Sequence, residues 1–132
     1  MTDKRVLMCL VIALAATGAA LPAHHSATAY GNTTIVLKNA TVTGLLWSNP
    51  HAILTFTVKD VKGRSANWSA ESGSPTSLQR IGWNRNSVKA GDAVTIEVYP
   101  ARNGATVSRL AKVVFPDGRT LLDSQNRSAV TQ

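Results

Sequence analysis

The chain has 132 residues and a net charge of +7 at pH 7, from 14 Lys and Arg against 7 Asp and Glu. This length suits one domain. The single cysteine, Cys9, excludes an internal disulfide and a cysteine-rich metal site. Acidic residues are too scarce to favour the paired carboxylates of a glycoside hydrolase. The basic residues are spread along the chain, which is typical of a solvated surface.

The first 23 residues have the organisation of a signal peptide. Lys4 and Arg5 form a basic start, and residues 6–20 are an almost unbroken apolar run, too short for a bilayer span of roughly 20 residues. We expect cleavage after Ala23, although a cut after Ala20 matches the small-residue rule better and would leave Pro22 close behind it. The product would be periplasmic or secreted, without stable membrane insertion, and export argues against a nucleic-acid partner.

The first half of the mature chain predicts three strands. Residues 24–34 are polar and predict a flexible lead. Residues 35–47 are rich in β-branched residues and lack proline, which favours a first strand with Gly44 as a bulge or bend. Residues 53–59 alternate so that Leu54, Phe56 and Val58 share one face of a strand, and residues 65–71 would pair with them as a hairpin.

A helix start and further strands follow. Ser74 is a good N-cap, and Pro75 fits the first helical position, so a short helix is expected there. Residues 93–99 and 106–115 predict two more strands, and residues 119–122 predict a short edge strand.

This order of elements favours a mainly β fold, namely a small OB-like five-stranded barrel with one short helix between the third and fourth strands. The barrel domain would span residues 35–122, and residues 123–132 would form a frayed tail. We expect Trp68 and Trp83 to fill the core, and Trp47 to lie nearer a site.

The strongest candidate for a site is the stretch Trp47-Ser48-Asn49-Pro50-His51, between the first two strands. Asn and Pro together predict a bend. The bend would place His51 at the start of a strand, where its imidazole can accept a proton or a metal near neutral pH. The simpler interpretation is that the ring hydrogen-bonds the backbone of the turn.

The three histidines fall into two groups, His24-His25 and His51. After cleavage at Ala23, His24 would present an amine and a ring nitrogen, a pair that Cu(II) favours, and His25 or His51 could complete a nitrogen-rich site. Zn(II) would need three or four ligands, with Glu71 as an oxygen donor. Copper or zinc is therefore the metal to expect, unless His24-His25 is only a disordered tail.

A binding module is the leading functional hypothesis, with an unidentified small ligand or envelope component as its partner. An enzyme is less expected: Ser48, His51 and Glu71 could form a hydrolytic triad on paper, but no nucleophile elbow is present. The ligand-binding residues we expect are Trp47, Asn49, His51, Glu71 and Tyr99.

Several motifs together resemble a family of small exported bacterial proteins known only as a domain of unknown function. The resemblance implies the same fold and an exported location, and it implies no activity. The residues that carry it are His24-His25-Ser26, Trp47-Ser48-Asn49-Pro50-His51, Asn67-Trp68, Glu71, Gly73-Ser74-Pro75, Gly82-Trp83, Gly91-Asp92 and Tyr99-Pro100-Ala101.

Overall fold

The computed structural model describes residues 29–126, which contain six strands and one helix. The helix, α1 (Pro75–Gln79), lies between the third and fourth strands in the chain. The strands are β1 (Ile35–Leu46), β2 (Ile53–Lys59), β3 (Ser65–Glu71), β4 (Ala93–Pro100), β5 (Val107–Val114) and β6 (Thr120–Leu122).

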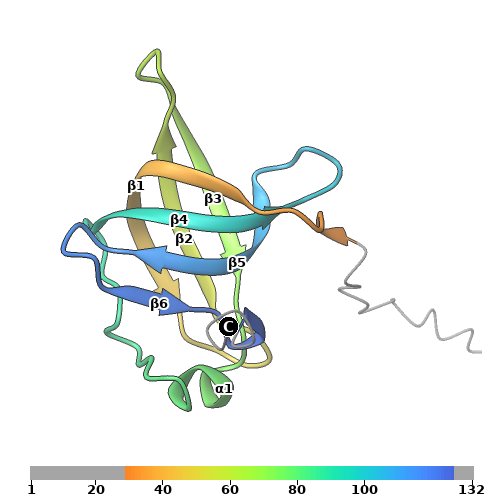
Figure 1. The fold of residues 1–132 in the computed structure, drawn as a ribbon, viewed down its shortest axis with the longest axis vertical. Helices are drawn as coiled ribbons and strands as arrows, with labels where there is room; N and C mark the ends of the chain where they lie inside the picture. The colour runs from red at the N-terminus through yellow and green to blue at the C-terminus, as the bar shows by residue number, and fades with distance from the viewer. Residues whose placement is uncertain (1–28, 127–132) are drawn as a thin grey trace, which may run out of the picture.

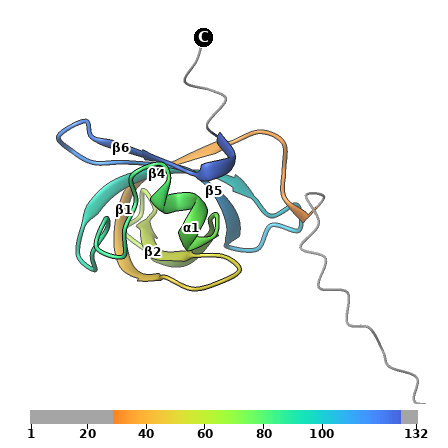
Figure 2. The same cartoon turned by 90° about the horizontal axis from the view of Figure 1, so that it is seen from below.

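The first five strands close into a barrel (Figure 1). The sheet order is β3-β2-β1-β4-β5-β6 with antiparallel neighbours, and a parallel pairing of β3 with β5 closes the ring. The helix α1 covers one end of the barrel (Figure 2). This arrangement confirms the predicted mainly β, OB-like five-stranded barrel with one short helix.

The inward faces of the strands form one hydrophobic core. Strict alternation places Leu54 and Phe56 of β2, and Ile96 and Val98 of β4, inside the barrel with at most 1% of each side chain exposed. The predicted irregularity at Gly44 is confirmed, because the β1–β2 register shifts between Val42 and Gly44. The barrel is therefore built as the apolar alternation predicted.

The core face of β5 does not follow simple alternation. Alternation alone places Ala111, Val113 and Phe115 on one face, but Leu110 and Ser108 are also fully buried. The β4–β5 register shifts opposite this point, so a bulge changes the phase of the strand at Leu110. The sequence pattern does not reveal such a bulge, because odd-numbered and even-numbered positions of β5 both contain buried residues.

The ends of the domain extend beyond residues 35–122. Tyr30 is 9% exposed and forms a β-bridge with Ala101, while Asp123 is 1% exposed and Asn126 bonds the carbonyl of Ala111. Tyr30, in the expected lead, and Asp123, in the expected tail, thus each contribute a buried side chain. The expected signal peptide, His24-His25 and the end of the tail lie outside the described residues.

The three tryptophans occupy different depths. Trp83 is 2% exposed and its indole N–H donates to the carbonyl of Leu122 at 2.8 Å, as a core residue should. Trp47 and Trp68 are half-buried and pack against the core from its edge. The core assignment is confirmed for Trp83, whereas Trp68 only partly enters the core.

An ion pair on the outer face of the sheet predicts a pH-dependent stability. Lys112 Nζ lies 2.8 Å from Glu97 Oε2, and the Thr34 hydroxyl donates to Oε1 at 2.7 Å. The hydrogen bond from Lys112, followed by that from Thr34, lowers the pKa of Glu97 below its ordinary value of 4.5. The stabilisation is therefore complete above pH 4.5 and is lost as pH falls through the lowered pKa.

We expect Glu97→Gln to reduce the free energy of unfolding by about 0.5 to 1 kcal/mol at neutral pH, because the pair is partly exposed to solvent. Urea titrations of both proteins across the acidic range measure the difference. It should disappear once Glu97 is protonated in the folded state. An unchanged difference at the acid end of the range would contradict this assignment.

Candidate functional site

The site lies at the end of the barrel where β2 begins and β3 ends. Ile53 pairs with Glu71, and two further hydrogen bonds continue the ladder beyond β2: Ser72 N–H to Ala52 O at 2.8 Å and Ala52 N–H to Gly73 O at 3.0 Å. This extension brings the segment before β2 alongside the segment after β3. It places His51 beside Glu71 and Ser72.

Both nitrogens of the His51 ring face oxygen atoms. Nδ1 lies 3.1 Å from the carbonyl oxygen of Ser72, and Nε2 lies 3.3 Å from Oε1 of Glu71. A carbonyl oxygen can only accept a hydrogen bond, so Nδ1 must carry the proton. In the neutral ring, Nε2 is then the unprotonated nitrogen, and its lone pair is directed toward a carboxyl oxygen. The side chains of His51 and Glu71 are 35% and 18% exposed.

Tyr30 holds the other oxygen of Glu71. Its hydroxyl donates to Oε2 at 3.2 Å. Burial raises the pKa of Tyr30 above 10.0, and the charge and hydrogen bond of Glu71 raise it further, while Arg109 partly opposes them. Tyr30 thus remains a hydrogen-bond donor at neutral pH and fixes one side of the carboxyl group. Sequence analysis missed Tyr30, because its segment has no periodic pattern.

A buried acid supports the backbone that holds His51. Oδ1 of Asp123 accepts hydrogen bonds from Ser72 Oγ at 2.6 Å and from Gly73 N–H at 2.9 Å. A Cβ atom at Gly73 would collide with the hydroxyl groups of Ser77 and Ser124, so any larger residue here would displace both hydroxyl groups. The Ser72 carbonyl that orients His51 is therefore fixed from two sides. The only sequence signal for Asp123 is its place directly after an apolar strand.

The turn before β2 does not support a hydrolytic triad. The hydroxyl of Ser48 donates to the backbone carbonyl of His51 at 3.5 Å, and it is not hydrogen-bonded to the ring. The Asn49–Pro50 peptide bond is cis, and both residues are exposed. The ring of His51 bonds the connection after β3, so the simpler expectation that it bonds its own turn is not what the structure shows.

Tyr99 lies next to this site through a cation–π contact. The guanidinium of Arg109 stands 4.1 Å from the centre of the Tyr99 ring, and Arg109 is the register partner of Glu71 in the β3–β5 pairing. The Tyr99 hydroxyl donates to Asn126 Oδ1 at 3.3 Å. Tyr99 also lines a hollow of ≈ 440 Å³ with Lys112. The lining of this hollow does not include Trp47.

Comparison with known proteins places the chain in a family. A family of unknown function, DUF6152, matches residues 11–109, which is most of the chain. The chain belongs to the DUF6152 family. This agrees with the resemblance inferred from the sequence motifs. No curated protein matches the chain, and no solved structure matches it.

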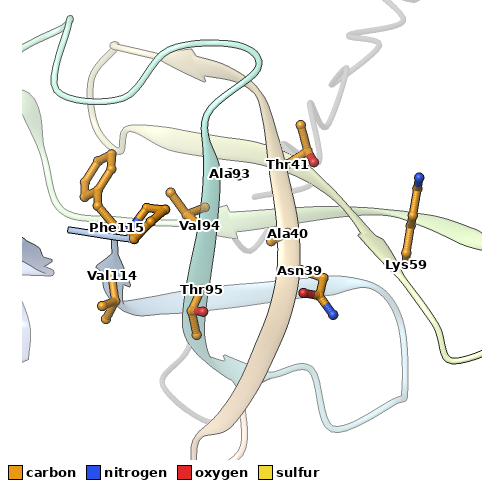
Figure 3. Close-up of a pocket in the computed structure, with 10 residues that line it drawn as sticks. Asn39, Ala40, Thr41, Lys59, Ala93, Val94, Thr95, Val114 and Phe115 are labelled. Atoms are coloured by element: carbon orange, nitrogen blue, oxygen red, sulfur yellow. The ribbon is translucent and has the colours of Figure 1, made fainter. Parts of the chain in front are cut away.

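A second hollow of the DUF6152 barrel, of ≈ 490 Å³, lies on its outer surface where β1 and β4 run side by side (Figure 3). Lys59 and Asn39 line one side, and Phe115 lines the other. Lys59 ends β2 whereas His51 precedes its start, so the seven residues of β2 separate this hollow from the His51 site. At about 3.3 Å per residue, the separation is roughly 20 Å.

Within residues 29–126 of this DUF6152 protein, no group of three or more His, Cys, Asp or Glu side chains is arranged to hold a metal ion. The structure brings together two of the expected donors, His51 and Glu71. His24 and His25, the other expected ligands, lie outside these residues. Over the same range, no helix is long and apolar enough to cross a membrane.

Proposed function

We propose that this DUF6152 domain is a metal-binding module of the cell envelope, with His51 and Glu71 as ligands of one divalent transition-metal ion. The observation that carries the proposal is the orientation of the His51 ring. The Ser72 carbonyl requires the proton on Nδ1 and places Nε2 3.3 Å from Glu71 Oε1, so in the neutral ring the lone pair of Nε2 faces this oxygen. Nε2 of His51 and Oε1 of Glu71 are both electron-rich, and a cation bound to both atoms would stabilise this arrangement.

The surroundings of His51 match those of metal-binding histidines elsewhere. Such histidines usually donate their second ring N–H to a backbone carbonyl or a carboxylate, which fixes the tautomer and the ring orientation. Here the Ser72 carbonyl accepts that proton, and Asp123 fixes Ser72. Tyr30 occupies Oε2 of Glu71, so Oε1 remains directed toward His51. One nitrogen and one oxygen donor suit Zn(II) or Cu(II).

Two donors do not complete a coordination sphere, and we propose that His24 and His25 supply the others. Six Cα–Cα steps separate His24 from Tyr30, whose hydroxyl bonds Glu71. An extended chain spans at most about 3.5 Å per residue, so this segment is long enough to reach across roughly 20 Å. Export and cleavage after Ala23 would place the α-amino group of His24 next to its ring, a chelating pair suited to Cu(II).

Calorimetric titration of the mature protein with Cu(II) and Zn(II) tests this proposal. The protein should be exported and its N-terminus verified by mass, because the proposal depends on residue 24. We expect one ion per chain, and we expect His51→Ala to weaken binding by about 100-fold or more, since even residues that only orient ligands contribute 10- to 100-fold. Glu71→Gln and His24→Ala should each weaken it as well.

The matched control is Glu97→Gln, which removes a carboxyl group on the outer face of β4 and should leave metal affinity unchanged. Thermal unfolding of each variant confirms that the barrel remains folded. Absence of metal uptake, or equal affinity in His51→Ala, would overturn the proposal.

A further inference from the structure

The hairpin that joins β2 to β3 projects from the barrel at the end opposite α1 (Figure 1). The last residue of β2 to pair with β1 is Val58, and β3 pairs with β5 only from Ser69 onward. In the described part of the chain, residues 59–65 therefore have no neighbouring strand on either side of the hairpin. The tip is presented to solvent and contributes nothing to the closure of the barrel, which makes it a candidate contact surface.

The tip carries a fully exposed valine on an ordered turn. Val61 is 103% exposed, more than any other large hydrophobic residue between residues 29 and 126. The carboxyl group of Asp60 accepts hydrogen bonds from the N–H groups of Lys62 at 2.8 Å and Arg64 at 2.9 Å. The N–H of Gly63, whose φ is 76°, donates to the carbonyl of Asp60 at 3.0 Å. Because the turn is already ordered, presenting Val61 to a partner costs little conformational entropy.

Positive charge surrounds this valine. Lys59, Lys62 and Arg64 lie within three residues of Val61, and Asp60 is the single acid among them. Arg64 pairs with Asp60 at 2.8 Å, whereas among residues 29–126 neither Lys59 nor Lys62 has an ion-pair partner. Both lysines are exposed. The tip thus combines an exposed apolar side chain with two ammonium groups that can meet an external anion.

The projecting hairpin also has one apolar face. Val58 and Ala66 are direct partners in the β2–β3 register, and the next pair toward the barrel on that face is Phe56 with Trp68. The barrel covers Phe56, which is 1% exposed, but Val58 is half-buried and Ala66 is exposed. The apolar face therefore continues out of the core along the hairpin toward its tip.

We propose that this hairpin tip attaches the protein reversibly to the surface of a bilayer that contains anionic phospholipids. Val61 enters the boundary between head groups and acyl chains, while Lys59 and Lys62 contact lipid phosphates. The apolar tip selects a bilayer over an acidic polysaccharide, which has anionic groups but no hydrocarbon layer for Val61. One inserted side chain and a few cations give weak binding that salt screens, which differs from stable membrane insertion.

Sedimentation of the mature protein with unilamellar vesicles tests the proposal. The vesicles are either pure phosphatidylcholine or an equal mixture of phosphatidylcholine and phosphatidylglycerol. We expect binding to the anionic vesicles that high salt releases, and little binding to the neutral ones. Val61→Ser should weaken binding to the anionic vesicles by about tenfold although the charge is unchanged, because it removes apolar surface. Lys62→Ala should weaken binding by about fivefold.

Arg85→Ala is the matched control, because Arg85 lies in the connection that follows α1, the helix at the opposite end of the barrel. It removes one positive charge, as Lys62→Ala does, and should weaken binding much less. Val61, Lys62 and Arg85 are all exposed, so each variant should keep the fold, which circular dichroism verifies.

The proposal holds only if Val61→Ser weakens binding and Lys62→Ala weakens it more than Arg85→Ala does. Any other result, including equal binding to neutral vesicles, overturns it. The metal titration is a separate test, because His51 and Glu71 lie at the other ends of β2 and β3, roughly 20 Å from the hairpin tip.

Discussion

Trp83→Ala is expected to lower the free energy of unfolding by about 4 kcal/mol, a typical loss for a buried tryptophan. Trp83 is 2% exposed and belongs to the core cluster with Leu78 of α1. Its indole N–H also fixes the carbonyl of Leu122, the last residue of β6. The substitution would leave a cavity between the helix and the barrel, and it would release the end of β6. Urea unfolding monitored by far-ultraviolet circular dichroism measures the effect.

Trp83→Phe separates the two contributions. Phenylalanine keeps most of the apolar volume but cannot donate to Leu122, so we expect a smaller loss of about 1 to 2 kcal/mol, from the hydrogen bond and the incomplete packing. A loss below about 1 kcal/mol for Trp83→Ala, with an unchanged denaturant slope, would show that this indole does not support the core as described.

Asp123→Ala should lower the free energy of unfolding by about 3 kcal/mol. The carboxyl group of Asp123 accepts hydrogen bonds from Ser72 Oγ and Gly73 N–H in a buried position. Removing it leaves both donors without their acceptor, and a buried unsatisfied group costs about 1 to 3 kcal/mol. Thermal or urea unfolding gives the stability change.

This variant also has an effect at a distance that a purely structural role would not produce. Ser72 supplies the carbonyl that orients His51, so loosening it should weaken metal binding by about tenfold even where the protein is fully folded. Asp123→Asn, which keeps an acceptor oxygen for Ser72, should retain more of both the stability and the affinity. If Asp123→Ala binds the metal as tightly as the unmodified protein does, Asp123 does not contribute to the orientation of His51.

Much of the fold follows from local signals in the sequence. Alternation over residues 53–59 and 93–98 identified β2 and β4 with their buried faces, because the pleat has a period of two. The start of α1 followed from Ser74, whose hydroxyl accepts the N–H of Ser77 at 3.2 Å, and from Pro75 in the first turn. These features depend only on neighbouring residues, which is why the sequence contains them.

The parts that sequence analysis missed depend on contacts between distant segments. The buried Leu110 reflects a bulge against β4, and Tyr30 is ordered by a bridge to Ala101 and a hydrogen bond to Glu71, 41 residues away. Asp123 lies 51 residues from Ser72. No local pattern encodes such contacts, because they arise only when the barrel closes.

The candidate site shows the same division. His51 and Glu71 were both singled out, since each is a donor next to a predicted strand end, and the β2–β3 register then brings them together. Tyr30, Ser72 and Asp123, which orient them, were not. Trp47 and Asn49 flank the turn before β2, and their part in ligand binding stays a prediction.

The most direct test of the metal proposal is the protonation state and ligation of the His51 ring itself. Long-range ¹H–¹⁵N NMR of the ¹⁵N-labelled mature protein distinguishes the two ring nitrogens, and Zn(II) can be added without paramagnetic broadening. We expect the metal-free protein at neutral pH to show the proton on Nδ1, and Zn(II) to shift the Nε2 resonance at one equivalent. A proton on Nε2 in the neutral ring, or an Nε2 resonance that Zn(II) leaves unchanged, would contradict the proposal.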